Sequence, residues 1–482
     1  MNRLLLAFLP LLLAFVAAAA GCKQEADWKT LNDEAWSLFE QGHYDEALGA
    51  AETALEMAEK AGGHDHPNVA TSLDIVALAY QAQSRYAEAE PLYKRSLAIR
   101  EKALGPDRPE VARPLSYLAA LLRVQGRYAE AEPLYQRSLA ILEKTFGPDH
   151  PDVALAMGNL AELYRTQGRY AEAESLYKDS LAIMEKGGGT GYPDLAKNLG
   201  NLADLYKTQG RYTLAEPLYE RSLAMYEKIC SRDHPLVATG LYNLAEFYRV
   251  QNQYTEAEPL YKRSLAIREK TFGPNHPDVA ACLNGLAQLY DSQALYAQAE
   301  PLYKRSLAIG EKIYGADHPW LGANLICLAG MYLKQGGYAQ AEPLYQRALT
   351  IHEKTLGPDH PYVASDLIYL ARLYQDQGQY AQPESLYQRA LAIDEKAFGP
   401  DHPDVATTLS NLAFLYYRQG QYAQAEPLFN RSLTIWEKAF GPDHPYVATT
   451  LDNLGALYRA TDRAKEAEPL EKRAAAIRAI KR

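Results

Sequence analysis

Histidines recur at one fixed spacing along the chain, and histidine is the residue type that most often binds metal ions. Eight of them are separated by 42 residues or a multiple of 42, at His66, His150, His234, His276, His318, His360, His402 and His444. If each 42-residue segment is one packed pair of helices, neighbouring histidines lie about 20 Å apart, because helices pack at about 8 to 10 Å. An ion binds its ligands at about 2 Å, so no two of these histidines can share one. We therefore interpret the series as a loop residue that precedes the proline at a helix start, and we predict no metal site.

The other side chains that could carry chemistry form no catalytic motif. The sequence contains no glycine-rich phosphate loop, no His-Glu-x-x-His motif and no nucleophile elbow. Besides Cys22 the only cysteines are Cys230, Cys282 and Cys327, each within a predicted helix, and we interpret them as buried free thiols. Lys and Arg number 50 against 60 Asp and Glu, so the charge does not support nucleic-acid binding. We predict a protein that is not an enzyme and that needs no cofactor.

These side chains must be positioned by a repeat that fills almost the whole chain. The stretch YAEAEPLYKRSLAIREK begins at Tyr86 and recurs with substitutions from Tyr128, Tyr254 and Tyr422. Its first position returns every 42 residues, at Tyr44, Tyr86, Tyr128, Tyr170, Tyr212, Tyr254, Tyr296, Tyr338, Tyr380 and Tyr422, with Ala464 in the eleventh place. A fixed period of this length is typical of stacked supersecondary units that cover one another's apolar faces.

One unit, from Pro403 to Phe440, contains two apolar stripes with helical spacing. The stripe of the first helix, helix A, is Val405, Leu409, Leu412, Ala413 and Tyr416. The stripe of the second helix, helix B, is Ala425, Leu428, Phe429, Ser432, Leu433 and Trp436. Gly420 lies between them, where a left-handed residue can end a helix, and the link GPDHP supplies a proline for the first turn of the next helix A. Ser84 and Ala294 replace the glycine in two units and should strain or reshape their turns.

The start of the chain differs in kind from the repeats. A charged start precedes an apolar run over residues 4–20, which is the layout of an export signal. This run is short for a membrane span and contains Pro10. The stretch AAGC that ends at Cys22 resembles the lipobox of bacterial lipoproteins, in which the cysteine is acylated.

The lipobox resemblance implies a signal peptide over residues 1–21, lipidation of Cys22 and a short lipidated tether over residues 22–26. With Lys23 after the cysteine, it also implies a bacterial cell envelope location, anchored to the outer membrane and facing the periplasm. An ordinary signal peptide or an uncleaved anchor is the alternative interpretation.

The repeats resemble the tetratricopeptide repeat. In the run NLAELYRTQGRYAEAESLYKDSL, the signature positions of that family hold Leu160, Ala161, Tyr164, Gly168, Tyr170, Ala173, Tyr177, Ser180 and Leu181. The 42-residue period and the GPDHP link resemble the longer form found in kinesin light chains and in many bacterial proteins. The resemblance implies an all-α fold over residues 27–482, a right-handed superhelical solenoid of about eleven antiparallel helix pairs. Unit boundaries are expected near residues 66, 108, 150, 192, 234, 276, 318, 360, 402 and 444.

The resemblance places the non-core positions of helix A on the concave surface, where related repeats bind peptides. One such position holds Asn159, Asn201 and Asn243 in three successive units, and Asn411 and Asn453 in the last two. Asparagine offers donors and an acceptor to a peptide backbone, although a solvated helix face explains the series equally well. Tyr369, Phe414 and Tyr417 could form an aromatic binding patch, or could pack on adjacent helices.

Three charge pairs accompany the asparagines on the same helices. Glu162 with Arg165, Asp204 with Lys207, and Glu246 with Arg249 are spaced three residues apart. Such pairs usually stabilise their own helix by a few tenths of a kcal/mol, roughly 0.2 to 0.5. We therefore rank them below the asparagines as site candidates.

Together these features predict a scaffold or adaptor that binds a peptide or a protein partner in its concave groove and is anchored to the membrane by its lipid. An alternative is a regulatory or sensor subunit of an enzyme complex whose catalytic domain is on another chain. No nucleic-acid partner is expected.

Overall fold

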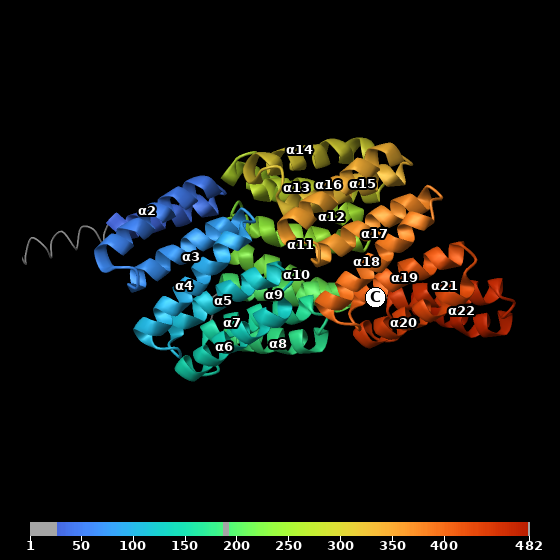
Figure 1. Cartoon of the computed structure of the whole chain (residues 1–482), viewed down its shortest axis with the longest axis horizontal. Helices are drawn as coiled ribbons and strands as arrows, with labels where there is room; N and C mark the ends of the chain where they lie inside the picture. Colours follow the sequence, from blue (N-terminus) through green and yellow to red (C-terminus); the bar gives the residue numbers. More distant parts are fainter. Residues whose placement is uncertain (1–26, 187–191, 481–482) are drawn as a thin grey trace, which may run out of the picture. The chain divides into compact units, whose positions relative to one another are not determined.

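The computed structural model describes residues 27–186 and 192–480, which form helices joined by short turns and contain no β-strand (Figure 1). The helices A are a helix over residues 27–40, α3 (Pro67–Ala82), α5 (Pro109–Val124), α7 (Pro151–Thr166), α9 (Tyr192–Thr208), α11 (Pro235–Val250), α13 (Pro277–Ser292), α15 (Pro319–Lys334), α17 (Pro361–Asp376), α19 (Pro403–Arg418) and α21 (Pro445–Ala460). The helices B are α2 (Tyr44–Gly62), α4 (Tyr86–Leu104), α6 (Tyr128–Phe146), α8 (Tyr170–Lys186), α10 (Tyr212–Ile229), α12 (Tyr254–Phe272), α14 (Tyr296–Tyr314), α16 (Tyr338–Leu356), α18 (Ala381–Phe398), α20 (Tyr422–Phe440) and α22 (Ala464–Ala479). This alternation confirms the predicted all-α solenoid.

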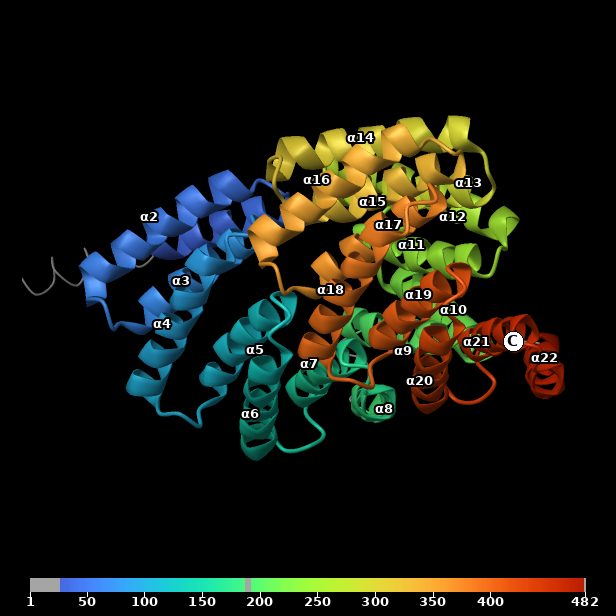
Figure 2. The ribbon, with the colours of Figure 1, turned by 45° about the vertical axis from the view of Figure 1, so that its right-hand side comes forward.

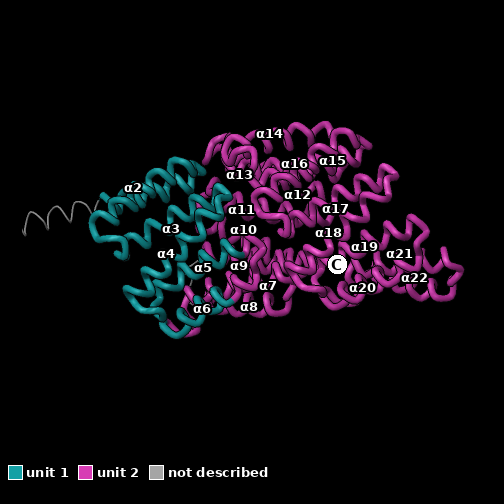
Figure 3. Tube along the Cα trace, in the orientation of Figure 1, with its two compact units in different colours: residues 1–122, 133–145 teal, residues 123–132, 146–482 magenta. Residues whose placement is uncertain are grey.

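The chain divides into two compact units (Figure 3). Unit 1 comprises residues 1–122 and 133–145, and unit 2 comprises residues 123–132 and 146–482. In unit 1 the core of α3 and α4 includes Leu73 and Ile99, and Trp28 Nε1 donates a 2.8 Å hydrogen bond to Ser72 Oγ.

In unit 2 each helix B from α8 to α20 packs against the helix A before it and the helix A after it, and α22 packs against α21. Consecutive helices A also contact each other directly, from α7 with α9 to α19 with α21. Elements of a curved stack approach most closely on its concave side. The helices A therefore line the concave face of unit 2, as the family resemblance implied.

The predicted core stripe is buried. In α19 the side chains of Val405, Leu409 and Ala413 are inaccessible to solvent, and Trp436 of α20 is 5% exposed. The largest fully buried side chains are the tyrosines that recur in helix B, at Tyr93, Tyr177, Tyr219, Tyr261, Tyr303, Tyr345 and Tyr387. Burial of such rings contributes much of the stability of each unit.

The repeated histidine caps the N-terminus of helix A. His402 Nδ1 accepts a hydrogen bond of 3.1 Å from the backbone N–H of Asp404, and Pro403 follows at the first helical position. The same bond forms at all eight positions, at His66, His150, His234, His276, His318, His360, His402 and His444. It satisfies a backbone donor that the helix itself leaves without a partner. The structural interpretation of these histidines is confirmed, and the structure adds their role as a cap.

The turn from helix A to helix B is left-handed in each form of its sequence. Gly420 has φ 74°, and Asn252 has φ 60° in the unit where it replaces glycine. Ser84 and Ala294 have φ 58° and 57°, so their turns keep the common form. A side chain disfavours this conformation, so Ser84 and Ala294 carry local strain. Of the two outcomes expected from the sequence, strain or a reshaped turn, the structure shows the strained turn.

The signal peptide over 1–21, the tether over 22–26 and Cys22 lie outside the described residues. Within the described ranges, no helix has both the length and the apolar character needed to cross a membrane.

Candidate protein-binding surface

The predicted asparagine positions lie on three successive helices A of unit 2. Asn159 of α7 is exposed, and Asn201 of α9 and Asn243 of α11 are half-buried. Among residues 27–186 and 192–480, the side-chain amides of these asparagines make no hydrogen bond. The structure thus brings the three into one row with their amides unused.

The charge pairs beside the asparagines do more than support their own helices. Glu162 of α7 accepts two hydrogen bonds from Arg165, at 2.9 and 2.7 Å. It also accepts a 3.0 Å hydrogen bond from the hydroxyl of Tyr177, the buried tyrosine of helix B in the same unit. The carboxylate therefore joins helix A to helix B while part of it faces the concave side.

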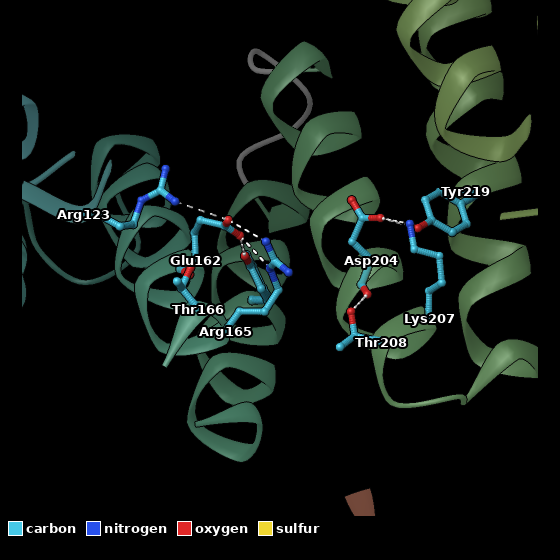
Figure 4. Close-up of polar contacts among 9 residues, drawn as sticks. Arg123, Glu162, Arg165, Thr166, Asp204, Lys207, Thr208 and Tyr219 are labelled. Atoms are coloured by element: carbon cyan, nitrogen blue, oxygen red, sulfur yellow. Dashed lines mark hydrogen bonds and ion pairs between the residues drawn. The ribbon is translucent and has the colours of Figure 1, made fainter. Parts of the chain in front are cut away.

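The next repeat, formed by α9 and α10, has the same geometry. Asp204 Oδ1 accepts hydrogen bonds of 2.6 Å from both Lys207 Nζ and the Tyr219 hydroxyl, as Figure 4 shows. One turn along each helix, Thr166 and Thr208 donate to the backbone carbonyls of Glu162 and Asp204, both at 2.9 Å (Figure 4).

In the repeat formed by α11 and α12, Arg249 Nη2 lies 2.8 Å from Glu246 Oε2, and the Tyr261 hydroxyl donates to Glu246 Oε1. We refer to these residues of α7, α9 and α11 as the inner ladder. Its members are Asn159, Glu162, Arg165, Asn201, Asp204, Lys207, Asn243, Glu246 and Arg249.

The charged row continues beyond the inner ladder on both sides. Arg123 Nη1 lies 3.8 Å from Glu162 Oε1 (Figure 4), and Asp291 Oδ2 accepts a 2.8 Å hydrogen bond from Lys334. Sequence reasoning missed the pair of Asp291 and Lys334 because the two residues belong to neighbouring repeats, on α13 and α15. A search for opposite charges one period apart could have found it, since the two residues are separated by 43 positions.

The contacts of the inner ladder shift the pKa of Glu162 and of Tyr219 in opposite directions. Burial raises the pKa of Glu162, but the hydrogen bonds from Arg165 and Tyr177 and the charges of Arg165 and Arg123 outweigh it and hold that pKa below its usual value. Burial, followed by the charge of Asp204 and the hydrogen bond to it, raises the pKa of Tyr219 far above its usual range. Glu162 is therefore an ionised acceptor, and Tyr219 remains a hydroxyl donor.

The two remaining asparagines and the aromatic residues lie farther along unit 2. Asn411 of α19 and Asn453 of α21 are half-buried. Phe414 and Tyr417 of α19 stack with ring centroids 6.2 Å apart, whereas Tyr369 of α17 stacks on the core ring of Tyr345 at 5.9 Å. The structure brings Phe414 and Tyr417 together. Tyr369 is 40% exposed and Phe414 is 36% exposed, so each is partly packed and partly accessible.

The three cysteines are free thiols, as predicted from the sequence, but the prediction that each is buried within a helix is wrong for Cys230, which is half-buried and follows the end of α10. Cys230, Cys282 and Cys327 are free thiols, and burial raises the pKa of both Cys282 and Cys327 to about 11. Neither is therefore a reactive thiolate at neutral pH. Across the described part of the chain, no group of three or more His, Cys, Asp or Glu side chains is arranged to hold a metal ion.

The chain matches the family model described as Tetratricopeptide repeat along most of its length. The matched ranges are residues 30–102, 74–123, 110–186, 168–228, 194–249, 236–312, 321–396, 367–433 and 404–479.

Similar solved structures include a kinesin light chain with nearly identical TPR-like repeats from P. anserina. It is 30% identical, the alignment covers 42% of this chain and 97% of that chain, and the TM-score is 0.36. BtubC from P. vanneervenii is 22% identical, with 48% and 91% covered and a TM-score of 0.39. A Rap protein complexed with competence and sporulation factor is 15% identical, with 77% and 99% covered and a TM-score of 0.51, a likeness of fold alone.

The family matches begin in the first helix A and end in the last helix B, and the repeat period and the paired helices agree with them. The chain therefore belongs to the tetratricopeptide repeat family and is similar to its kinesin light chain-like members.

Proposed function

We propose that this chain is a protein–protein interaction scaffold without enzymatic activity of its own, which binds an extended peptide segment of its partner along the inner ladder. A lipid on Cys22 holds it at the membrane. The observation that supports the binding role is the row of Asn159, Asn201 and Asn243, which repeats in one register on three successive helices with its amides unused.

The chemistry of the row suits a peptide main chain. Each asparagine amide can donate to a peptide carbonyl and accept from a peptide N–H, so a regularly spaced series can follow an extended backbone whatever its side chains are. The carboxylates beside the asparagines are already bound by Arg165, Lys207 and Arg249. Because these charges pair within the ladder, the surface favours a segment that is not strongly charged.

The aromatic residues supply a second contact for the same partner. Tyr369, Phe414 and Tyr417 lie on α17 and α19, and Tyr369 and Phe414 are exposed by 40% and 36%. Partly exposed aromatic rings favour contact with apolar side chains of a protein. In this proposal Asn411 and Asn453 extend the polar contacts toward the end of the solenoid.

Anchorage rests on the lipobox-like stretch at Cys22. Lys23 follows the cysteine, so the proposed location is the outer membrane of a bacterial envelope, with the solenoid facing the periplasm. A lipid anchor would keep a long binding surface close to the membrane and to the proteins assembled there.

The binding role is tested by crosslinked capture of partners from membranes with the triple variant Asn159→Ala, Asn201→Ala and Asn243→Ala. The variant should recover at least about fivefold less partner, since lost hydrogen bonds of about 0.5 to 1.5 kcal/mol each add across three sites. Its helicity should equal that of the wild type, because the three side chains contact no core residue through a hydrogen bond in the described ranges.

A matched control removes asparagines elsewhere. Asn275 lies in the link before α13 and Asn430 lies on α20, and both are exposed. The double variant Asn275→Ala and Asn430→Ala should recover partner like the wild type. Equal recovery by the triple variant would place the binding surface elsewhere, and recovery of a single enzyme would favour the role of a regulatory subunit.

A further inference from the structure

Two capping histidines of unit 2 contact an earlier turn of the same solenoid. His360 Nε2 lies 2.9 Å from the backbone carbonyl oxygen of Val124, and His402 Nε2 lies 3.2 Å from that of Thr166. Each contact joins residues 236 positions apart. Within unit 2, the starts of α17 and α19 therefore meet the ends of α5 and α7, and Figure 2 shows α18 beside α7.

The backbone approaches each histidine closely. A Cβ on Gly126 would lie 3.1 Å from Pro361 Cδ, and a Cβ on Gly168 would lie 2.9 Å from His402 Cδ2. Both glycines have left-handed φ angles, of 72° and 70°. A larger residue at either place would separate the two turns.

Aromatic stacks flank the histidine contacts. Tyr128 stacks on Phe398 at 5.4 Å with 17° between the rings, and Tyr170 stacks on Phe440 at 5.3 Å with 18°. Tyr128 and Tyr170 are only 7% and 8% exposed. The contact between turns is therefore a packed interface, in which the histidines are the polar members.

The hydrogen bonds define which nitrogen of each ring carries the proton. Nδ1 of His360 accepts from the N–H of Tyr362, and Nδ1 of His402 accepts from the N–H of Asp404, both at 3.1 Å. Nε2 must then hold the proton and donate it to the carbonyl of the earlier turn. One neutral tautomer satisfies both contacts, whereas a doubly protonated ring would turn a second N–H against the backbone donor.

We propose that His360 and His402 form an acid-sensitive lock between successive turns of unit 2, closed while both rings are neutral and released when they are protonated. Release would separate α17 and α19 from the ends of α5 and α7 while leaving the helices folded.

The groups that face His360 do not stabilise its charged form. From α16 comes His352, whose Nδ1 lies 2.6 Å from Asp366 Oδ2, and from its own helix comes Tyr362. From the earlier turn comes Tyr128, which interacts electrostatically with Tyr362, Arg123 and Asp404. The pKa of His360 is lowered from an ordinary value of 6.5 to about 4, mainly by burial and also by the charge of His352, and only the hydrogen bond to Val124 opposes this.

His402 differs because a carboxylate faces it. Its Nδ1 lies 3.6 Å from Asp404 Oδ2, and from the earlier turn comes Tyr170, which interacts electrostatically with Asp404, Arg165 and Tyr446. Burial still lowers the pKa of His402, although Asp404 and the hydrogen bond to Thr166 oppose it.

The acidic residues that precede both histidines already have partners. Asp359 and Asp401 each accept a 2.5 Å hydrogen bond, from Lys396 and Lys438 respectively. Phe398 stacks on the ring of His402 at 4.1 Å and adds no charge.

The pKa values of the two forms of the lock determine how pH changes the balance between them. In the open form a ring regains its ordinary pKa of 6.5, whereas in the closed form the value for His360 is about 4. Acid therefore favours the open form between these limits, by up to about tenfold per ring for each pH unit. Above about pH 6.5 the lock is at full strength, and below about pH 4 no further change accumulates.

The test is solution scattering of the whole protein, with helicity followed by circular dichroism, from about pH 7.5 to about pH 4.5. The radius of gyration of the wild type should rise while its helicity stays constant. The double variant His360→Asn and His402→Asn keeps a capping acceptor but cannot be protonated in this range. Its radius should not depend on pH.

A control variant carries the same change at histidines that only cap. His66 and His234 accept the N–H two residues ahead, at 3.2 and 3.1 Å, and are more exposed than His360. The variant His66→Asn and His234→Asn should expand in acid like the wild type. A constant wild-type radius, or the same acid expansion in His360→Asn and His402→Asn, would overturn the proposal.

A measurement on the wild type does not depend on any variant folding. The imidazole resonances of His360 and His402 should titrate at lower pH than an ordinary histidine, which titrates near about pH 6.5. Titration of both rings near about pH 6.5, with no change of radius, would also overturn the lock.

Discussion

The hydroxyl of Tyr177 donates a 3.0 Å hydrogen bond to Glu162 Oε2, so a core side chain of helix B fixes a carboxylate on the concave face of helix A. The same bond joins Tyr219 to Asp204 and Tyr261 to Glu246. A fully buried ring cannot move freely, so these bonds hold the inner ladder in one arrangement. The core of each unit and the candidate binding surface are therefore coupled.

Removing one of these hydroxyls should destabilise the fold. Tyr219→Phe deletes the donor to Asp204, while Lys207 still binds the carboxylate. Because the acceptor is charged, we expect the free energy of unfolding to fall by about 1 to 2 kcal/mol, measured by urea denaturation followed by circular dichroism.

Tyr303→Phe is the matched control for this substitution. The ring of Tyr303 occupies the equivalent place in α14 and is 1% exposed, but its hydroxyl has no hydrogen-bond partner among the described residues. Loss of an unsatisfied buried hydroxyl should leave stability unchanged or raise it slightly. Equal losses in the two variants would show that the bond to Asp204 does not determine the effect.

A buried carboxyl in α18 should make stability depend on pH. Asp394 is 3% exposed and accepts a 2.7 Å hydrogen bond from Thr408 Oγ1. Burial raises the pKa of Asp394 to about 7 from an ordinary value of 3.8, so the folded state favours the protonated form. The contribution of this group is full below about pH 3.8 and is lost as the pH rises toward about 7.

Asp394→Asn should therefore stabilise the protein at about pH 8 more than at about pH 4.5. The shift corresponds to at most roughly 4 kcal/mol, and we expect about 1 to 2 kcal/mol because the new amide needs a partner for its own N–H groups. Urea midpoints of variant and wild type at the two pH values give the difference. As a control, Asp401→Asn changes an exposed residue and should alter the free energy of unfolding by less than about 1 kcal/mol at both pH values.

Two glycine substitutions should have opposite effects. A Cβ on Gly322 of α15 would lie 2.5 Å from His352 Cε1. That ring cannot yield, because its Nδ1 lies 2.6 Å from Asp366 and its Nε2 lies 3.0 Å from the Pro319 carbonyl oxygen. Gly322→Ala should cost about 1 to 3 kcal/mol in thermal or urea unfolding.

Gly49 of α2 provides the comparison, since a Cβ there would meet nothing within 4 Å. Gly49→Ala should raise stability by about 0.5 to 1 kcal/mol, because alanine loses less backbone entropy in a helix. If Gly322→Ala were also stabilising, the packing around His352 would be looser than the structure shows.

The sequence alone predicts the helices and their pairing because these depend on short-range pattern. The stripe that includes Leu409 and Leu412 gives helix A, and the left-handed turn at Gly420 ends it. The contact of His360 with Val124 depends instead on how far each helix pair is rotated relative to the next, and this small rotation adds up over several repeats. A constant 42-residue period contains no value for that rotation, so the closure between turns could not be predicted.

The candidate site was predicted in part for a similar reason. The positions of Asn159, Glu162 and Arg165 on one helix follow from their spacing. To predict the bond from Tyr177 to Glu162, one must know how two helices are placed relative to each other. The pair of Asp291 and Lys334 requires the same knowledge for two neighbouring repeats. Such contacts are set by packing and leave only a weak trace in local sequence.

The proposed lipid anchor predicts covalent labelling at a single residue. Cells grown with a radioactive or alkyne-bearing fatty acid should label the wild-type protein, and Cys22→Ala should abolish the label because the lipobox cysteine is the acylated residue in the lipoproteins that this stretch resembles. Cys230→Ala is the control, since Cys230 is a half-buried free thiol within unit 2 and should leave labelling unchanged. Labelling that survives Cys22→Ala would remove the basis for membrane anchorage through a lipid. The peptide-binding proposal would remain, because it depends only on the concave face of unit 2.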